Sequence, residues 1–205
     1  MAGVERESDR VVRLVMMGAA GVGKSALIRR FQHGHFERKC TRTVEELHAL
    51  TYRAADDDDA GKVRLEILDT GGSYAFPAMR ELSIRRGDAF ALVYAVDDPA
   101  SFREVARLRD EILARKKGAR LIVVGHKADL TEAEGRVLFA ADVAPLVEKE
   151  WRASFVEASS LTGTNAVGVF LALLQHVRLP QRLSPVITGG RARPPLKQCN
   201  SCPLS

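Results

Sequence analysis

Residues 18–25 read Gly18-Ala19-Ala20-Gly21-Val22-Gly23-Lys24-Ser25. This run matches G-x-x-x-x-G-K-[ST], a pattern typical of loops that bind the phosphates of nucleotides. An apolar run at 11–17 precedes it and predicts a buried strand, and Leu27, Ile28 and Phe31 follow at helical spacing. The motif therefore stands between a strand and a helix, as such a loop requires.

Each residue type in this loop has a physical task. Glycines let consecutive backbone N–H groups converge on a polyphosphate, and the N-terminus of the following helix adds partial positive charge. Lys24 can reach the β- and γ-phosphates, and the Ser25 hydroxyl can bind Mg²⁺. We predict nucleotide contacts along the loop at Ala20, Gly21, Val22, Gly23, Lys24, Ser25 and Ala26.

Length and composition fit one compact domain with short tails. The chain has 205 residues and is 46% hydrophobic, and no apolar run reaches the length of a membrane span. The N-terminus is polar with mixed charge, unlike a signal peptide, and three cysteines favour reduced thiols over a disulfide framework. We expect a disordered N-terminus at 1–10, a domain at 11–180 and a flexible basic tail at 181–205.

The net charge of +5 has a specific location. From Ala158 onward there is no Asp or Glu. The basic residues of this segment account for the whole excess of Lys and Arg over Asp and Glu in the chain. They are Arg178, Arg182, Arg191, Arg193 and Lys197. A basic tail on a neutral body fits an anionic partner, either membrane or nucleic acid, and fits equally a solvated tail without a partner.

Strand-like and helix-like segments alternate along the domain. Predicted strands lie at 11–17, 43–52, 63–68, 90–96, 121–124 and 154–157, and the helices include 135–151 and one that a capping box, Ser101-x-x-Glu104, opens. Asp56 to Asp59 read as a solvated hairpin turn. The order predicts an α/β fold with a six-stranded, mostly parallel sheet, one antiparallel edge strand and helices on both faces.

Polar runs follow four of the predicted strands. Beside the phosphate loop these are Asp69-Thr70-Gly71-Gly72, His126-Lys127-Ala128-Asp129 and Ser159-Ser160. In an open α/β sheet, ligands bind at the carboxyl ends of the strands. Asp69 stands where a carboxylate holds Mg²⁺ through water. The two oxygens of Asp129 match the N1–H and N2–H₂ donors of guanine, which adenine lacks.

With these runs in order, residues 10–178 resemble a Ras-superfamily small GTPase of the P-loop NTPase class. Phe76-Pro77-Ala78-Met79 is most similar to the Di-Ras and dexamethasone-induced Ras branch. The resemblance implies a signalling switch, expected to be a monomer, that binds GTP or GDP with Mg²⁺. It also implies effector proteins at the switch regions and leaves the exchange factor open.

The resemblance also assigns roles to single residues. Thr43 would bind Mg²⁺ and sense the γ-phosphate, and the Gly72 N–H would meet that phosphate. Phe36 would stack on the base edge, and Ser159 and Ser160 would lie at guanine O6. The residues expected at the reacting phosphate are Lys24, Thr43, Gly72 and Ser73, and magnesium is expected at Ser25, Thr43 and Asp69.

Two departures from the family pattern concern hydrolysis. Ser73 stands where the family usually has the Gln that orients the attacking water, and serine is too short to reach that water. Ala20 stands where Ras proteins often have glycine, and its methyl group crowds the place of an incoming arginine finger. Because such an arginine contributes ~10³–10⁵ in rate, both changes predict slow hydrolysis and a bias to the GTP-bound state.

Two further departures concern affinity. His126 replaces the usual Asn, and we expect its ring not to reproduce an amide that donates and accepts together. Leu161 replaces the usual Lys after the serine pair. Weaker nucleotide binding and faster exchange are expected. The first switch, Arg38 to Arg42, is unusually basic, so effector choice does not follow from Ras analogy.

The chain ends Cys202-Pro203-Leu204-Ser205, a C-a-a-X box of the farnesyl class with an unusual proline. One lipid anchors weakly, so the basic residues or palmitate on Cys199 would supply a second signal. The tail lacks aromatic side chains for base stacking, which disfavours nucleic acid. We expect attachment to the cytoplasmic face of the plasma membrane or of an internal membrane.

Two other functions compete with the GTP switch. The same departures fit a cycle-deficient GTPase-fold scaffold or sequestering module, although Lys24, Ser25, Thr43, Asp69 and Asp129 are all retained. A P-loop kinase would need a lid over an acceptor substrate and would leave Asp129 without a task.

Overall fold

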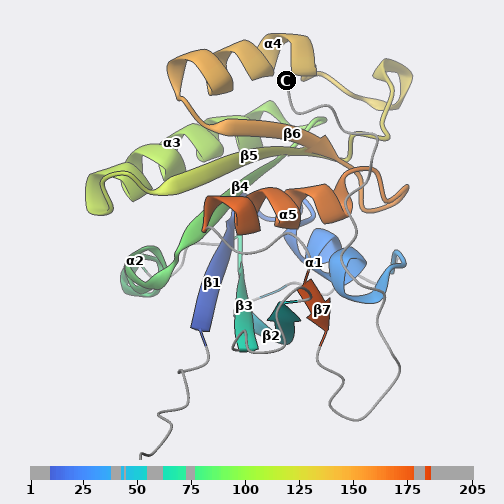
Figure 1. Cartoon of the computed structure of the whole chain (residues 1–205). Helices are drawn as coiled ribbons and strands as arrows, with labels where there is room; N and C mark the ends of the chain where they lie inside the picture. The colour runs from blue at the N-terminus through green and yellow to red at the C-terminus, as the bar shows by residue number, and fades with distance from the viewer. Residues whose placement is uncertain are drawn as a thin grey trace, which may run out of the picture.

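The strand that leads into the glycine-rich loop, β1 (Arg10–Met17), lies in the middle of a seven-stranded sheet (Figure 1). The structure is a computed structural model that describes residues 10–37, 43, 45–54, 62–72, 77–177 and 183–185. The strand order is β6-β5-β4-β1-β3-β2-β7. β1 pairs in parallel with both β3 and β4, so the carboxyl ends of these strands meet at one edge.

The other strands are β2 (Glu45–Ala54), β3 (Lys62–Thr70), β4 (Ala89–Ala95), β5 (Arg120–His126), β6 (Ser154–Ala158) and β7 (Leu183–Pro185). The helices are α1 (Lys24–His33), α2 (Pro77–Arg86), α3 (Pro99–Arg115), α4 (Ala140–Pro145) and α5 (Ala166–His176). A short 3₁₀ turn, η1 (Glu132–Glu134), precedes α4, and a π-helical turn, η2 (Leu146–Glu150), extends it.

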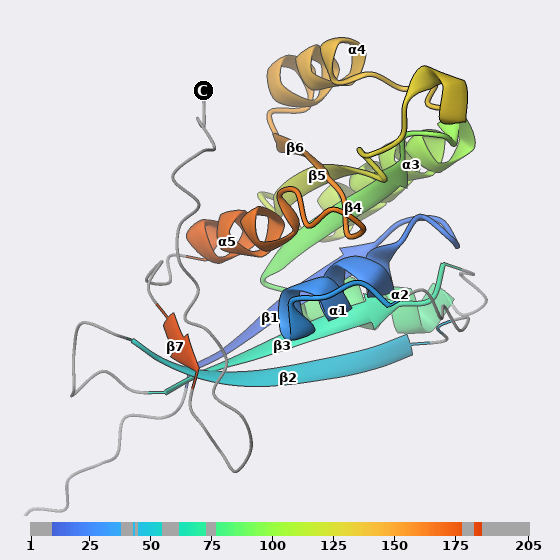
Figure 2. The same cartoon turned by 90° about the vertical axis from the view of Figure 1, so that its right-hand side faces the viewer.

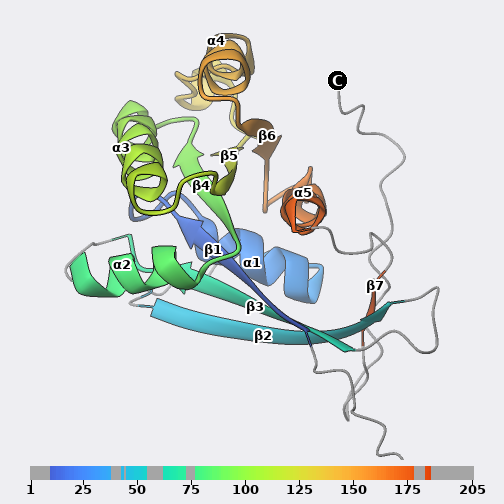
Figure 3. The ribbon, with the colours of Figure 1, turned by 60° about the vertical axis from the view of Figure 1, so that its left-hand side comes forward.

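Helices cover both faces of the sheet, as predicted. Figures 2 and 3 show α1 and α5 on one face and α2 and α3 on the other. On the first face Phe31 of α1 stacks on Phe170 of α5 with ring centroids 4.1 Å apart. On the second face Ile84 of α2 and Leu108 of α3 are fully buried against β4 and its neighbours. Burial of β4 on both sides explains its continuous apolar sequence.

The predicted parallel sheet with an antiparallel β2 is confirmed for β1 to β6. A seventh strand, β7, pairs antiparallel with Tyr52, Arg53 and Ala54 at the end of β2. It lies within 181–205, the segment predicted to be a tail. Three residues are too few to display a strand period, so the pattern of the sequence does not reveal β7.

The capping prediction for α3 was wrong. The helix begins at Pro99, and the Asp98 side chain accepts hydrogen bonds from the backbone N–H groups of Ala100 and Ser101. Asp at the N-cap followed by Pro is itself a favoured start. The Ser101 hydroxyl instead donates to the Asp98 carbonyl and accepts from the Ala95 N–H.

The helix predicted at 135–151 begins later than expected. Gly135 has a φ of 96° and ends η1, and α4 starts only at Ala140. A left-handed glycine ends a helical turn, so helix cannot begin there. The missed capping box lies one turn earlier, where Thr131 and Glu134 bond to each other's backbone N–H groups.

An ion pair joins the two helices of the second face. Arg80 of α2 donates to Glu111 of α3 at 2.8 Å, and both side chains are nearly buried. Arg107 and Arg115 also contact Glu111, and together these cations hold the pKa of its carboxyl below the usual value despite its burial. α2 is therefore attached to α3 by charge as well as by packing.

No helix within the described ranges is long and apolar enough to cross a bilayer. Several predicted features lie outside the described residues. They are the Asp56–Asp59 turn, the basic 38–42 segment with Cys40, Ser73, Cys199 and Cys202.

Candidate functional site

The glycine-rich loop is shaped by close backbone contacts. Gly18 has a φ of 146°, and a Cβ there would lie 2.0 Å from the Val93 carbonyl oxygen of β4. Gly23 has a φ of 97°, and a Cβ there would lie 2.2 Å from Nδ1 of His126. Only glycine fits both positions. The loop therefore packs on β4 and His126, and α1 begins directly after Gly23.

Lys24 is buried at the start of α1, and its ammonium is held inside the loop. Nζ donates to the carbonyl oxygens of Gly18 at 2.9 Å and Ala19 at 2.8 Å. Burial lowers the pKa of Lys24 to about 8, and the nearby carboxylate of Asp69 partly opposes this. An anion in the loop would favour the charged ammonium. The loop thus presents one oriented positive charge to a phosphate group.

Ser25, Thr43 and Asp69 meet at the carboxyl end of β3, as predicted. The Ser25 hydroxyl donates to Oδ2 of Asp69 and lies 2.8 Å from the Thr43 hydroxyl. Asp69 is fully buried, and its Oδ1 has no hydrogen-bond partner within the described part of the chain. Burial raises the pKa of this carboxyl, although Ser25 and Lys24 oppose the shift. Two hydroxyls beside a buried carboxylate form a donor set that suits a hard cation.

Gly72 follows Asp69 and lies directly against the glycine-rich loop. A Cβ on Gly72 would be 2.1 Å from the backbone nitrogen of Ala20, so the two backbones are in contact. Thr70 secures the strand end by donating from its hydroxyl to the Met16 carbonyl at 2.8 Å. The Gly72 segment is thereby positioned beside Ala20.

His126 connects three loops. Its Nδ1 lies 2.6 Å from the Val22 carbonyl, which can only accept, so Nδ1 carries the proton. Nε2 then accepts from the Ser160 N–H at 3.2 Å and the Ser160 hydroxyl at 3.1 Å. The expectation that this ring cannot donate and accept together was wrong, because its two nitrogens perform the two tasks. Burial lowers the pKa of His126 to about 4, which keeps the ring neutral.

The remaining predicted polar residues also meet here. The Ser159 hydroxyl donates to Oδ1 of Asp129, and the Ala128 N–H donates to the Ala158 carbonyl at 3.2 Å. Lys127 has a φ of 64° and forms an ion pair with Asp97 at 2.9 Å. Asp97 is absent from the residues predicted from sequence. Its position just after β4, at the same edge of the sheet, is the signal that could have found it.

Two predicted residues are less closely integrated. Phe36 is half-buried just beyond Gly34, which ends α1 in the left-handed conformation. Leu161 is 50% exposed beside the buried pair Ser159 and Ser160. Because its side chain has no polar group, Leu161 adds no side-chain hydrogen bond to this loop.

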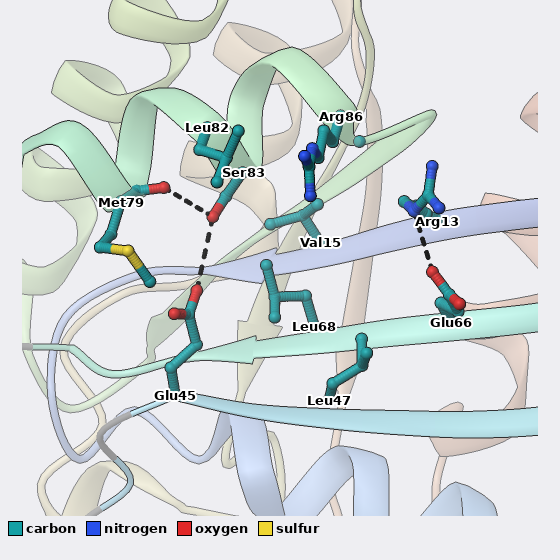
Figure 4. A pocket seen from close by; sticks show the side chains of 11 residues that line it. Arg13, Val15, Glu45, Leu47, Glu66, Leu68, Met79, Leu82, Ser83 and Arg86 are labelled. Atoms are coloured by element: carbon teal, nitrogen blue, oxygen red, sulfur yellow. Dashed lines mark hydrogen bonds and ion pairs between the residues drawn. The ribbon is translucent and has the colours of Figure 1, made fainter.

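A groove of about 250 Å³ lies outside these loops, between α2 and the face of the sheet that α2 covers (Figure 4). Leu47 of β2, Leu68 of β3 and Met79 and Leu82 of α2 form its apolar lining. Leu47 and Met79 are 55% and 49% exposed. The Ser83 hydroxyl reaches Glu45 at 3.4 Å and so connects α2 to β2 across the groove.

The neutral state of His126 predicts a pH-dependent stability. In the unfolded chain an ordinary histidine binds a proton near pH 6.5, whereas folded His126 does so only near pH 4. Between these values the unfolded state binds more protons, so stability is present above pH 6.5 and is lost as the pH falls. In urea unfolding, the wild type should lose about 2 kcal/mol more than His126→Asn between pH 7 and pH 5.

His35→Asn is the matched control, because His35 is exposed at the end of α1. Its stability should change with pH as that of the wild type does. Equal losses in the wild type and His126→Asn would contradict the assignment of a buried neutral ring.

Comparison with known proteins agrees with this geometry. The sequence model of the Ras family matches residues 13–179. "GTP-binding protein Rhes" of Mus musculus and of Rattus norvegicus are each 37% identical over 185 residues, covering 85% of this chain and 68% of theirs. The human protein of that name is 36% identical with the same coverage. The narrower likeness to the Di-Ras and dexamethasone-induced Ras branch stays a prediction. The predicted relationship is confirmed: this chain belongs to the Ras family of small GTPases.

Proposed function

We propose that the chain is a guanine-nucleotide switch that binds GTP or GDP with Mg²⁺ and hydrolyses GTP slowly. The observation that carries this proposal is the meeting of a phosphate cradle and a base-reading carboxylate at one edge of the sheet. Lys24 is oriented inside the loop, and Asp129 is fixed by the Ser159 hydroxyl. His126 bonds to both the loop and Ser160 and sets the span between them.

Magnesium fits the residues present. Ser25 and Thr43 supply hydroxyl oxygens, and Asp69 supplies the carboxylate oxygen Oδ2, which accepts from the Ser25 hydroxyl. The ion would neutralise charge on the β- and γ-phosphates. Lys24 would hold the same phosphates from the other side, and Gly72 would offer its N–H next to Ala20.

Slow hydrolysis follows from what this chain lacks near the reacting phosphate. Ser73 follows Gly72 directly, and its side chain is too short to orient a water molecule as a Gln does. The Ala20 backbone lies against Gly72, and the methyl group at this position would crowd the place of an incoming arginine finger. Both features support a switch biased to the GTP-bound state.

The hydrogen bonds of His126 support faster nucleotide exchange, because both ring nitrogens already have partners within the protein. Its only N–H donates to Val22, and its other nitrogen accepts from Ser160. No donor of the ring remains for the base. We propose that this residue organises the site but contributes little direct affinity.

We also propose a membrane-attached protein that recruits effectors. The basic tail with Cys199 and Cys202 supports attachment to the cytoplasmic face of a membrane. The groove between α2 and β2 supports effector binding, because it combines exposed Leu47 and Met79 with the charges of Arg86 and Glu45. Along the chain, β2 follows Thr43 and α2 follows the Gly72 segment, the two segments that the γ-phosphate would order.

Base specificity tests nucleotide binding. Asp129→Asn removes a carboxylate that accepts from guanine, and each charged hydrogen bond is worth about 1.5–3 kcal/mol. GDP affinity should fall at least about 100-fold, and xanthosine diphosphate, which has a carbonyl in place of the amine, should bind better. Fluorescent-nucleotide titration measures both. Asp110→Asn, exposed on α3, should leave both affinities unchanged. An intact preference for GDP in Asp129→Asn would contradict the assignment.

Single-turnover GTP hydrolysis tests the slow cycle. The double change Ala20→Gly with Ser73→Gln should raise the rate at least about tenfold by restoring an amide that reaches the water. Ala20→Gly with Ser73→Asn is the control, since its amide is one carbon shorter. A wild-type rate equal to that of ordinary Ras proteins would refute the proposal.

Fractionation of cells tests the tail. Cys202→Ser should move most of the protein from membranes to the soluble fraction, because basic residues alone bind weakly. Cys40→Ser, which lies outside the tail, should leave the distribution unchanged. Unchanged membrane association of Cys202→Ser would exclude the lipid.

A further inference from the structure

Next to the predicted magnesium ligands lies a second group of metal-binding side chains. Glu46 and His48 of β2 and Asp69 of β3 each offer one ligand atom, and these atoms lie within 4.8 Å of one another. Glu46 stands opposite Asp69 in the antiparallel register, and His48 follows two residues later. Side chains two residues apart lie on the same face of a strand, so Glu46 and His48 share the face on which their atoms approach Asp69.

The face that they occupy is separate from the groove. Figure 4 shows Glu45 and Leu47 of β2 lining the groove on the α2 side of the sheet. Because side chains alternate along a strand, Glu46 and His48 lie on the other side, facing α1. The cluster and the groove are therefore independent surfaces.

Two buried ligand atoms in the cluster lack partners. The His48 side chain is only 10% exposed, and its Nε2 has no hydrogen-bond partner in the described part of the chain. Its nearest charged neighbour, Oε2 of Glu46, is 3.7 Å away, beyond hydrogen-bond distance. Oδ1 of Asp69 is equally without a partner among the described residues. Buried polar atoms normally find partners, so two orphan atoms on neighbouring side chains of one cluster indicate a missing ligand.

We propose that Glu46, His48 and Asp69 form a binding site for a divalent transition-metal ion, with Zn²⁺ as its probe. An imidazole nitrogen with two carboxylates suits Zn²⁺, whereas Mg²⁺ and Ca²⁺ prefer oxygen ligands alone. Tetrahedral zinc places its ligands about 3.4 Å apart. Glu46 is half exposed and can rotate inward to close the remaining distance. Three protein ligands leave the fourth position to water.

The site is distinct from that of magnesium, although the two share one carboxylate. Oδ2 of Asp69 accepts from Ser25, on the side of the phosphate loop, and leaves Oδ1 for the second ion. A bound ion would fasten the start of β2, which follows Thr43, to the end of β3. The proposal goes beyond nucleotide binding and does not depend on hydrolysis.

Zinc titration of the full-length chain tests the site. All proteins carry Cys40→Ser, Cys199→Ser and Cys202→Ser, because thiolates bind zinc strongly. Calorimetry with Zn²⁺ should show one site, and His48→Gln and Glu46→Gln should each weaken its affinity by more than about tenfold. Changing a residue that only supports a ligand already costs about that much, so loss of a direct ligand should cost at least as much. Circular dichroism and a melting curve establish that the variants are folded.

His35→Gln is the matched control, since His35 pairs with Glu37 at 3.5 Å but has no third ligand described nearby. It should leave zinc affinity unchanged. Equal affinity in the parent protein and folded His48→Gln, or loss of the site in His35→Gln alone, would overturn the proposal. GDP binding, measured separately with a fluorescent nucleotide, distinguishes this failure from failure of the nucleotide site.

Discussion

A single buried imidazole holds the site together. His126 donates to the phosphate loop at Val22, accepts from Ser160 after β6, and packs against Gly23. The phosphate loop and the loop that carries Ser160 are far apart in sequence, and His126 contacts both. The neutral ring is stable there because burial disfavours its charged form. This one side chain therefore links the phosphate loop to the loop after β6.

Buried charge distinguishes the other half of the site. Lys24 and Asp69 are both removed from water. Burial lowers the pKa of Lys24 and raises the pKa of Asp69, so it favours the neutral form of each group. The two groups oppose each other's shifts, as expected of a pair of opposite charges. Such a pair is costly without further partners, and an anionic phosphate with a cation would supply them. The site is therefore preorganised for a ligand that carries both.

The same strands serve two different surfaces. Residues of β2 and β3 alternate between the α2 face, where they form the groove, and the α1 face, where Glu46, His48 and Asp69 gather. The ion pair between Arg80 and Glu111 holds α2 against α3 beside the groove. Movement of α2 would therefore alter the groove alone, whereas movement of the start of β2 would alter both surfaces.

The sequence by itself determined which motifs form the site and their order along the chain: a phosphate loop, then Asp69, then Asp129 and the serine pair. It could do so because these motifs combine fixed spacing with positions at strand ends, where parallel strands converge. The start of α3, the delayed start of α4 and the strand β7 were decided by local capping, a left-handed Gly135 and three residues of pairing. None of these has a periodic signal.

Only the tertiary structure revealed the neighbours of His126, Asp97 and His48. Each lies beside a group distant in the chain: Val22 for His126, Lys127 for Asp97, and Asp69 for His48. Residue type did not show that an imidazole could replace an amide, because the answer depended on which acceptor faced each ring nitrogen. Side-chain partners across a sheet are set by register and burial, and these exist only in the folded chain.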